Sequence, residues 1–198
     1  MKSLALVLLS SMLVVAQSPK AREAYDKARK EVAHGHLGRA EKQAKEAIAE
    51  APTWALAHAE LGDIYFYMPQ PEAAGVAYGH ARDIDLKDHS LTQEQRREVY
   101  GNLSYVLGTT GEHDKSIVIL EAALKEDPNF GTYEYNLACN YSEQGDLDKA
   151  LAHLKRAWEL RDTFKFPDVT RDSSFVRWRN DPNFQRAAKQ MGSPTPSP

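Results

Sequence analysis

The chain matches itself at a spacing of 34 residues, and this spacing limits its fold more than any other feature. The matching pairs are Ala40 and Ala74, Ala47 and Ala81, Leu103 and Leu137, Gly111 and Gly145, and Ala123 and Ala157. Between the two halves the spacing from Ala81 to Ala123 is 42 residues, so about eight residues are inserted there. A unit of this length is a pair of helices that buries its apolar face only against its neighbours, so a stack of such units is expected.

Small residues recur inside each unit at positions where two helices must approach closely. Gly62, Ser104 and Ala138 take one such position in the predicted first helices. Larger apolar side chains three or four residues away give each helix one apolar stripe. Gly111 and Gly145 are expected to end first helices, because a positive φ is favoured at that point.

These positions resemble the pattern of the tetratricopeptide repeat (TPR) family. The second unit reads His58-x-x-Leu61-Gly62-x-x-Tyr65, followed by Ala74, Tyr78 and Ala81. The fourth unit reads Leu137-Ala138-x-x-Tyr141, followed by Ala150, Leu154 and Ala157. The resemblance covers roughly residues 21–164 and implies an all-α fold, a right-handed α-solenoid of about four TPR helical hairpins.

The predicted boundaries follow this alignment. The four repeats are expected at residues 21–54, 55–88, 97–130 and 131–164, with an inter-repeat insertion at 89–96. In the first repeat, Lys27 and Glu31 stand where a large apolar pair would normally lie. A polar cap at the end of the solenoid explains this departure, because a terminal unit has no neighbour on one side. The alternative is a frayed or misphased first helix.

A C-terminal helical cap is expected at residues 165–190, where the period stops. Phe175, Val176, Trp178 and Phe184 are too many large apolar residues for a free tail, so we expect them to cover the last repeat. The segment resembles the closing unit of exported bacterial TPR proteins, the "end-of-group" type. Residues 191–198, which are rich in Pro and Ser, are expected to be a disordered tail.

Residues 1–16 are expected to be a secretory signal peptide. Met1-Lys2-Ser3 supplies a positive start, an apolar run reaches Val15, and Val14 and Ala16 suit a cleavage site. The alternative is a single membrane anchor, but a helix of about twelve residues spans roughly 18 Å of a hydrocarbon core that is roughly 30 Å thick. The sequence therefore predicts an exported bacterial protein, periplasmic or secreted, that does not insert in the membrane after cleavage.

No pattern in the sequence favours catalysis, a cofactor or a metal. The seven His include His34 and His36 beside a turn, without Cys or carboxylates at ligand spacing. No nucleophile elbow, phosphate loop or zinc-protease motif occurs. Cys139 is the single cysteine and is expected to be a small, semi-buried residue rather than a reactive thiol. A net charge of −3 and the lack of a polybasic run argue against nucleic acid as a partner.

The resemblance implies a binding groove lined by the first helix of each repeat. The residues expected to face it are Tyr25, Arg29, Ala59, Asp63, Phe66, Tyr67, Asn102, Tyr105, Tyr135, Asn136 and Cys139. Aromatic residues in this set offer contact area at low entropic cost, and such residues are enriched at interfaces. The TPR clamp that holds chaperone carboxylates needs Lys and Arg at positions where this chain has Tyr25, Glu60 and Glu98, which argues against that ligand.

Asn102 and Asn136 occupy the same position in adjacent repeats. Each amide offers two donors and an acceptor, enough to bracket one peptide unit of an extended ligand. A ladder of such asparagines is known in TPR proteins that hold extended peptides by the backbone. The alternative is that both residues bond within the stack and only support it.

The function expected from the sequence is a non-catalytic protein–protein interaction module that binds a peptide or protein segment in its concave groove. One alternative is a structural subunit of a cell-envelope assembly that uses its convex face or its ends. A weaker alternative is an enzyme whose residues form no known motif.

Overall fold

The computed structural model describes residues 18–192, so the predicted signal peptide and residues 193–198 of the predicted tail lie outside the described residues. Residues 18–192 are largely helical and contain no strand. The α-helices are α1 (Pro19–Ala33), α2 (Leu37–Glu50), α3 (Ala55–Tyr67), α4 (Pro71–Asp88), α5 (Gln93–Thr109), α6 (His113–Glu126), α7 (Gly131–Gln144), α8 (Leu147–Glu159) and α9 (Pro182–Gln190). Two short 3₁₀ helices are η1 (Arg161–Thr163) and η2 (Ser173–Trp178). Among these described helices, none has the length and apolarity that crossing a bilayer requires.

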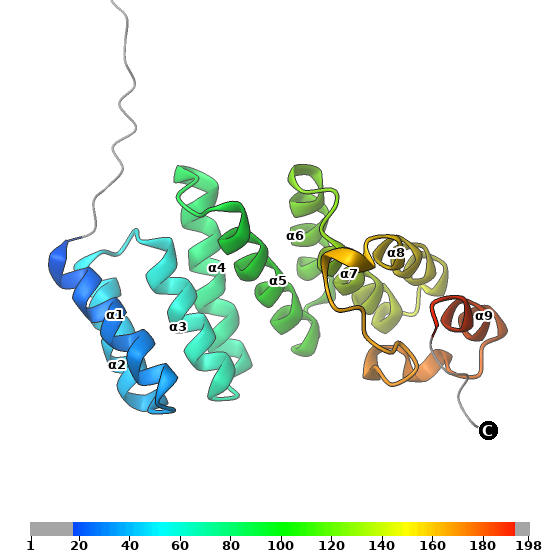
Figure 1. Ribbon diagram of the computed structural model, residues 1–198, viewed down its shortest axis with the longest axis horizontal. Coiled ribbons are helices and arrows are strands. Elements are labelled where there is room, and N and C mark those ends of the chain that lie inside the picture. Colours follow the sequence, from blue (N-terminus) through cyan, green and yellow to red (C-terminus); the bar gives the residue numbers. More distant parts are fainter. Residues whose placement is uncertain (1–17, 193–198) are drawn as a thin grey trace, which may run out of the picture.

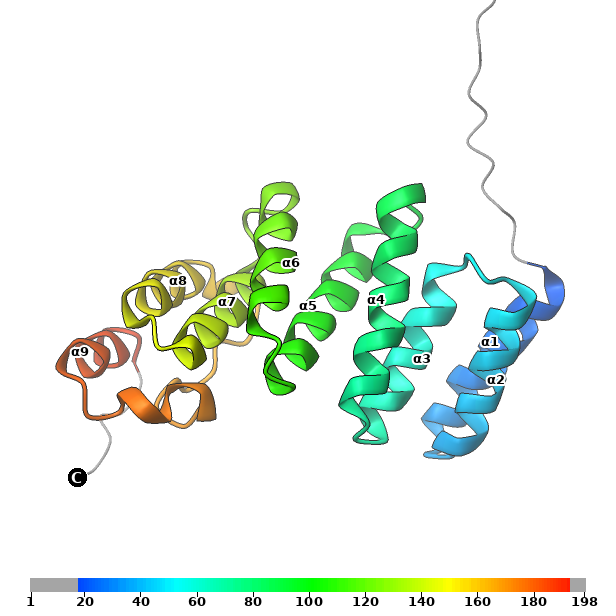
Figure 2. The same ribbon diagram turned by 180° about the vertical axis from the view of Figure 1, so that it is seen from behind.

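Consecutive helices form hairpins that stack side by side into an elongated solenoid (Figure 1). The hairpins are α1 with α2, α3 with α4, α5 with α6, and α7 with α8. Helices α3, α5 and α7 lie on the side nearer the viewer in Figure 1. In Figure 2, which shows the molecule from behind, α4 and α6 lie on the nearer side. We call the side formed by α1, α3, α5 and α7 the first-helix face and the opposite side the second-helix face. The predicted all-α solenoid of four hairpins is confirmed.

Small residues set the distance between the two helices of a hairpin, as the sequence predicts. Gly62 lies so close to Tyr78 that a Cβ at position 62 would come within 2.6 Å of the ring. Ala74 and Ala150, on the second helices α4 and α8, are fully buried. A larger side chain at these positions would force the helices apart, because close-packed interiors have no spare volume.

Glycine turns end the first helices of the third and fourth hairpins. Gly145 follows α7 with φ +87°, and the N–H of Asp146 donates to the carbonyl of Tyr141 at 2.9 Å. Gly111 has φ +80° at the corresponding turn after α5. The turn of the second hairpin has no glycine. Its second helix, α4, begins at Pro71, and proline is tolerated there because the N–H of a first helical residue has no hydrogen-bond partner within the helix.

The predicted insertion at 89–96 joins the second and third hairpins. Helix α4 extends to Asp88 and α5 begins at Gln93, so the insertion forms a short link and the first turn of α5. Thr92 caps α5, because its side chain accepts from the N–H of Gln95 while the Gln95 side chain accepts from the N–H of Thr92.

Asp85 fixes the geometry of this joint from the inside. Its carboxylate, only 1% exposed, accepts from Arg96 Nε at 2.6 Å, from the N–H of Leu91 at 2.9 Å and from the hydroxyl of Tyr100 at 3.1 Å. These donors come from the linker and from α5. One buried carboxylate thus ties the end of the second hairpin to the start of the third.

The first hairpin packs on small residues. Its α1 buries Ala21, Ala24, Tyr25 and Ala28, and is a regular helix rather than a frayed one. Lys27 is exposed and pairs with Glu23 at 2.8 Å, as expected of a terminal unit that faces solvent.

The C-terminal segment packs over the fourth hairpin. Phe175 and Phe184 are fully buried with ring centroids 5.6 Å apart, where η2 packs against α7 and α9 against α8. Arg177 donates to the carbonyls of Ser142 and Glu143 at the end of α7. The predicted helical cap is therefore present, but Val176 is 49% exposed and does not belong to its apolar core.

The predicted start of the disordered tail at residue 191 is wrong. Met191 is 7% exposed and belongs to the main apolar core. The packed structure continues past α9 because this side chain contributes to the contact between the cap and the solenoid.

Candidate binding surface

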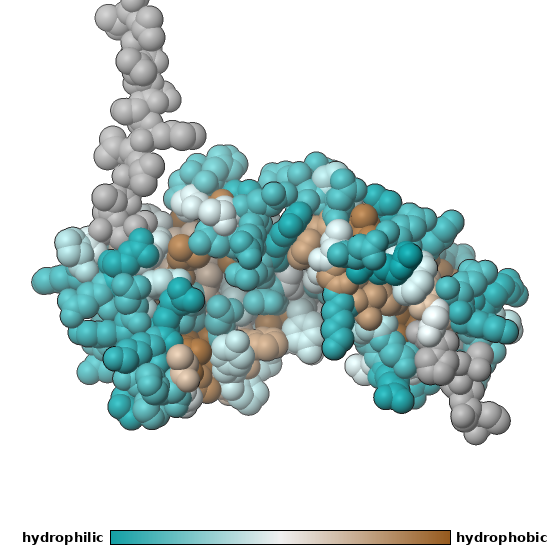
Figure 3. Space-filling view, in the orientation of Figure 1, coloured by the Kyte–Doolittle hydropathy of each residue, from teal (hydrophilic) through white to brown (hydrophobic). Residues whose placement is uncertain are grey.

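Two adjacent hollows lie on the first-helix face. The first, of about 550 Å³, lies between α3, α5 and α7, and the second, of about 730 Å³, lies between α5, α7 and the segment Asp172–Ser174. Tyr105 and Asn136 line both hollows, so the two form one continuous depression. Figure 3 shows this face, on which apolar patches interrupt a largely hydrophilic surface. We call this depression the groove.

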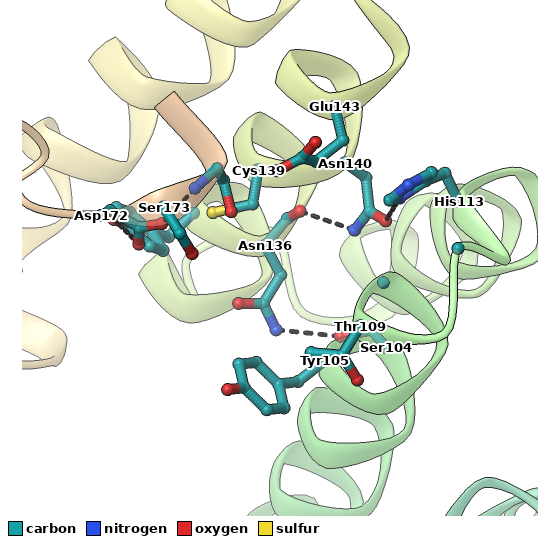
Figure 4. A pocket seen from close by; sticks show the side chains of 14 residues that line it. Ser104, Tyr105, Thr109, His113, Asn136, Cys139, Asn140, Glu143, Asp172 and Ser173 are labelled. Atoms are coloured by element: carbon teal, nitrogen blue, oxygen red, sulfur yellow. Dashed lines mark hydrogen bonds between the residues drawn. The ribbon is translucent and has the colours of Figure 1, made fainter. Parts of the chain in front are cut away.

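The second hollow is polar (Figure 4). Asn136 and Asn140 project from α7, Tyr105 and Thr109 from α5, and Asp172 comes from the C-terminal segment. This segment therefore forms one wall of the hollow. The sequence analysis did not identify Asp172 as part of the site, because a non-repeating segment gives no period from which its position could be read.

Asn140 is a polar centre in this hollow that the sequence analysis also missed. Its Nδ2 donates to Ser116 Oγ at 2.9 Å and to the carbonyl of Asn136 at 2.8 Å. Its Oδ1 lies 3.0 Å from His113 Nδ1. Its position in the sequence, one helical turn after Asn136, could have indicated that Asn140 lies on the same face of α7.

Asn102 and Asn136 bond across the stack rather than only facing the groove. Asn136 Nδ2 donates to Ser104 Oγ at 2.9 Å and to the carbonyl of Gly101 at 3.3 Å. Asn102 Nδ2 donates to the hydroxyl of Tyr78 at 3.3 Å and to Asp63 Oδ1 at 3.4 Å. The geometry favours the alternative in which these residues support the stack, since the amide donors are engaged with the preceding hairpin.

Two aromatic residues predicted to line the groove are largely buried. Tyr25 is 8% exposed and lies against Trp54, with ring centroids 4.7 Å apart. Tyr135 is also 8% exposed, and its hydroxyl donates to Asp172 Oδ2 at 2.7 Å. Tyr25 lines neither hollow, whereas Tyr135 lines the second hollow with little exposed surface, because its hydroxyl is held by the C-terminal segment.

The exposed aromatic surface of the groove comes from α3 and α5. Phe66, Tyr67 and Tyr105 are 43%, 59% and 53% exposed. The Phe66 ring lies 6.2 Å from Tyr67 and 5.9 Å from Tyr105. Phe66 and Tyr105 line the first hollow, and Tyr67 lies next to Phe66 outside its lining, so the three rings form one aromatic patch.

Carboxylates gather beside this patch. Burial raises the pKa of Glu60 to about 7, with a further rise from the nearby charge of Asp63 and a partial offset from Arg29. Burial also raises the pKa of Asp63, although hydrogen bonds from Tyr78 and Asn102 oppose the rise. The pKa of Glu98 rises through burial and through repulsion from Asp63 and Glu94. Predicted site residue Arg29 is exposed and lies 3.8 Å from Glu60.

Cys139 lies in the wall of the second hollow without being a reactive thiol. Burial raises its pKa well above the usual value, and the charge of Asp172 adds to the rise. The thiolate is therefore scarce at neutral pH, in agreement with the sequence interpretation. Within residues 18–192, no group of three His, Cys, Asp or Glu side chains is placed to hold a metal ion.

The structure so far defines a helical-repeat protein with an accessible groove on its first-helix face. Residues 98–130 and 135–164 match the sequence model of the tetratricopeptide repeat family. The third and fourth hairpins thus match this family by sequence, and the first two hairpins continue the same solenoid.

Solved structures of TPR proteins share this fold. A crystal structure of MamA has a TM-score of 0.63 at 23% identity, over 73% of this chain and 81% of that chain. MamA 41-end from Desulfovibrio magneticus RS-1 has a TM-score of 0.66 at 14% identity, over 89% and 92%. YrrB, described as a TPR protein with an unusual peptide-binding site, has a TM-score of 0.62 at 17% identity, over 86% of each chain. No curated protein matches the sequence.

Proposed function

We propose that the chain is a non-catalytic scaffold that holds an extended peptide or protein segment in its groove. The observation that carries this proposal is the exposed aromatic patch of Phe66, Tyr67 and Tyr105 at the rim of a continuous depression. Large exposed aromatic rings on a concave surface offer apolar area that a partner can bury, and such residues are enriched at interfaces. The peptide-binding site ascribed to the structurally similar YrrB supports the same assignment.

The groove favours side-chain recognition over a backbone ladder. Asn136 and Asn102 use their amide donors within the stack, so only their carbonyl oxygens could accept from a ligand N–H. The aromatic rings and the carboxylates around them remain as the groups that select a partner. The scaffold would act outside the cytoplasm, as residues 1–16 suggest.

A second candidate function uses the second-helix face. Val76 and Val118 are 62% and 66% exposed there, and Val118 lines a hollow of about 460 Å³ together with Leu107 and Ile119. An exposed apolar surface of this kind suits a fixed contact in an assembly. The chain would then be a structural subunit whose groove carries no ligand.

Photo-crosslinking in intact cells separates the two functions. A benzophenone amino acid replaces Tyr105 in the groove and, in a matched variant, Val118 on the second-helix face. The groove function predicts protein adducts from position 105 that disappear on adding Phe66→Ala, and few adducts from position 118. Adducts confined to position 118 would refute groove binding and support the assembly function.

A further inference from the structure

The first hollow of the groove combines aromatic rings with carboxylates. Its lining includes Phe66, Tyr105 and Phe130, together with Glu94 and Glu98. Glu98 and Tyr105 lie on one side of α5, two helical turns apart, since residues seven apart return to the same face. The rings and the carboxylates therefore border the same space.

The carboxylates in and beside this hollow have few direct ion-pair partners among the described residues. Within residues 18–192, Glu94, Glu98 and Asp63 form no salt bridge, and Glu60 has only Arg29 at 3.8 Å. The Arg29 side chain is itself 65% exposed. The protein thus concentrates like charges along α3 and α5 at a cost in electrostatic repulsion.

Arg97, the cation in the lining, is committed elsewhere. Its Nε donates to Asp127 Oδ2 at 2.5 Å, and its Nη2 donates to Asp127 Oδ1 at 3.1 Å. Its guanidinium also lies 4.6 Å from the centroid of the Phe130 ring. Because this bidentate pair holds Arg97 on Asp127, Arg97 forms no salt bridge with Glu94 or Glu98 and interacts with Glu94 only at longer range, so an incoming cation would meet two carboxylates that no direct ion pair occupies.

We infer that the groove selects a cationic partner: an extended segment whose Lys or Arg side chains enter the first hollow, against the rings of Phe66 and Tyr105 and beside Glu94 and Glu98. This inference rests on the proposed function and specifies the chemistry of its ligand. Lys and Arg are attracted both to the faces of aromatic rings and to carboxylates, and this hollow offers the two together. An acidic segment would bring its own carboxylates close to Glu94 and Glu98, and this repulsion would disfavour its binding.

Selection from a phage-displayed library of random dodecapeptides tests the inference on residues 17–198. We expect the peptides retained by the protein to be enriched in Lys and Arg, and a synthetic copy to bind in fluorescence anisotropy. Its affinity should fall at least about tenfold in the double variant Glu94→Gln with Glu98→Gln, and should weaken as NaCl is raised. The matched control, Glu72→Gln with Asp148→Asn, removes the same charge from the second-helix face and should leave affinity unchanged.

The outcomes distinguish this inference from the proposed function. Enriched peptides that need Phe66 and Tyr105 but contain no excess of Lys or Arg would overturn the cationic ligand and leave groove binding intact. Equal affinity for the Glu94→Gln, Glu98→Gln variant would do the same. A library that yields no peptide lost on Phe66→Ala with Tyr105→Ala would overturn the proposed function itself. A circular dichroism melting temperature of the Glu94→Gln, Glu98→Gln variant at or above that of the wild type excludes unfolding as the cause of lost binding, since these changes remove repulsion from the folded state.

Discussion

Removing the buried carboxylate of Asp85 should destabilise the joint between the second and third hairpins. Replacement by Ala leaves the guanidinium of Arg96 without its anion, and leaves the N–H of Leu91 and the hydroxyl of Tyr100 without an acceptor. Breaking a buried pair by removing one partner costs about 3–5 kcal/mol, because the remaining charge stays partly buried. We expect Asp85→Ala to lower the free energy of unfolding by that amount.

Urea unfolding followed by far-ultraviolet circular dichroism measures this loss. The matched control is Asp88→Asn, since Asp88 is exposed and accepts only from the N–H of Ser90 at 3.0 Å. That control should change stability by less than about 1 kcal/mol. In a repeat protein, weakening one interface lets its two sides unfold separately. Fluorescence of Trp54 should therefore change at lower urea than that of Trp158 in the Asp85→Ala variant.

The pH dependence provides a second measure of the same interaction. Burial alone raises the pKa of Asp85, but hydrogen bonds from Arg96 and Leu91 and the charge of Arg96 outweigh it, and the pKa lies below its usual value. A carboxylate with a lowered pKa stabilises the fold above its unfolded pKa of about 3.9, and this stabilisation disappears as the pH falls. The difference between wild type and Asp85→Ala should thus shrink below about pH 4. A cost under about 1 kcal/mol at pH 7 would refute the role of the network.

Three further predictions concern single side chains. Leu137→Ala should cost about 2–5 kcal/mol in urea unfolding, because Leu137 is fully buried, and a cost under about 1 kcal/mol would show that the repeat alignment is out of phase. Asn136→Ala should cost about 1–3 kcal/mol, because Ser104 and Gly101 lose a donor, and an unchanged melting temperature would contradict its structural role. Because burial raises the pKa of Glu60 to about 7, the folded state binds a proton there that the unfolded state lacks. Stability from this residue should therefore decrease between about pH 4.5 and pH 7, and Glu60→Gln should remove that slope in thermal melts.

The repeating part of the fold could be predicted because its physical requirements recur. Gly62 and Ala74 are small where helices touch, and Gly145 has the positive φ that a helix end favours. These requirements arise from contacts within one hairpin, and the same contacts recur in the next hairpin. The residues that meet them therefore recur at the repeat spacing and can be recognised in the sequence.

The candidate site was less predictable because it depends on what covers each repeat. Tyr25 and Tyr135 occupy predicted groove positions, yet Trp54 covers one and the C-terminal segment covers the other. The electrostatic repulsion between Glu98 and Asp63 acts between two hairpins, so neither repeat alone reveals the carboxylate cluster. Phe66 and Tyr105 remained exposed because no element of the described chain packs over them.

The segment Asp172–Ser174 makes the groove directional. It forms a wall beside α7, where the hydroxyl of Tyr135 donates to Asp172 and the hydroxyl of Ser142 donates to the carbonyl of Ser174. Under the proposed function, a bound segment would meet this wall at the fourth hairpin and the side chains of α3 at the opposite end of the groove. The two ends of the groove are therefore built from different kinds of structure, one from a non-repeating segment and one from a repeat helix.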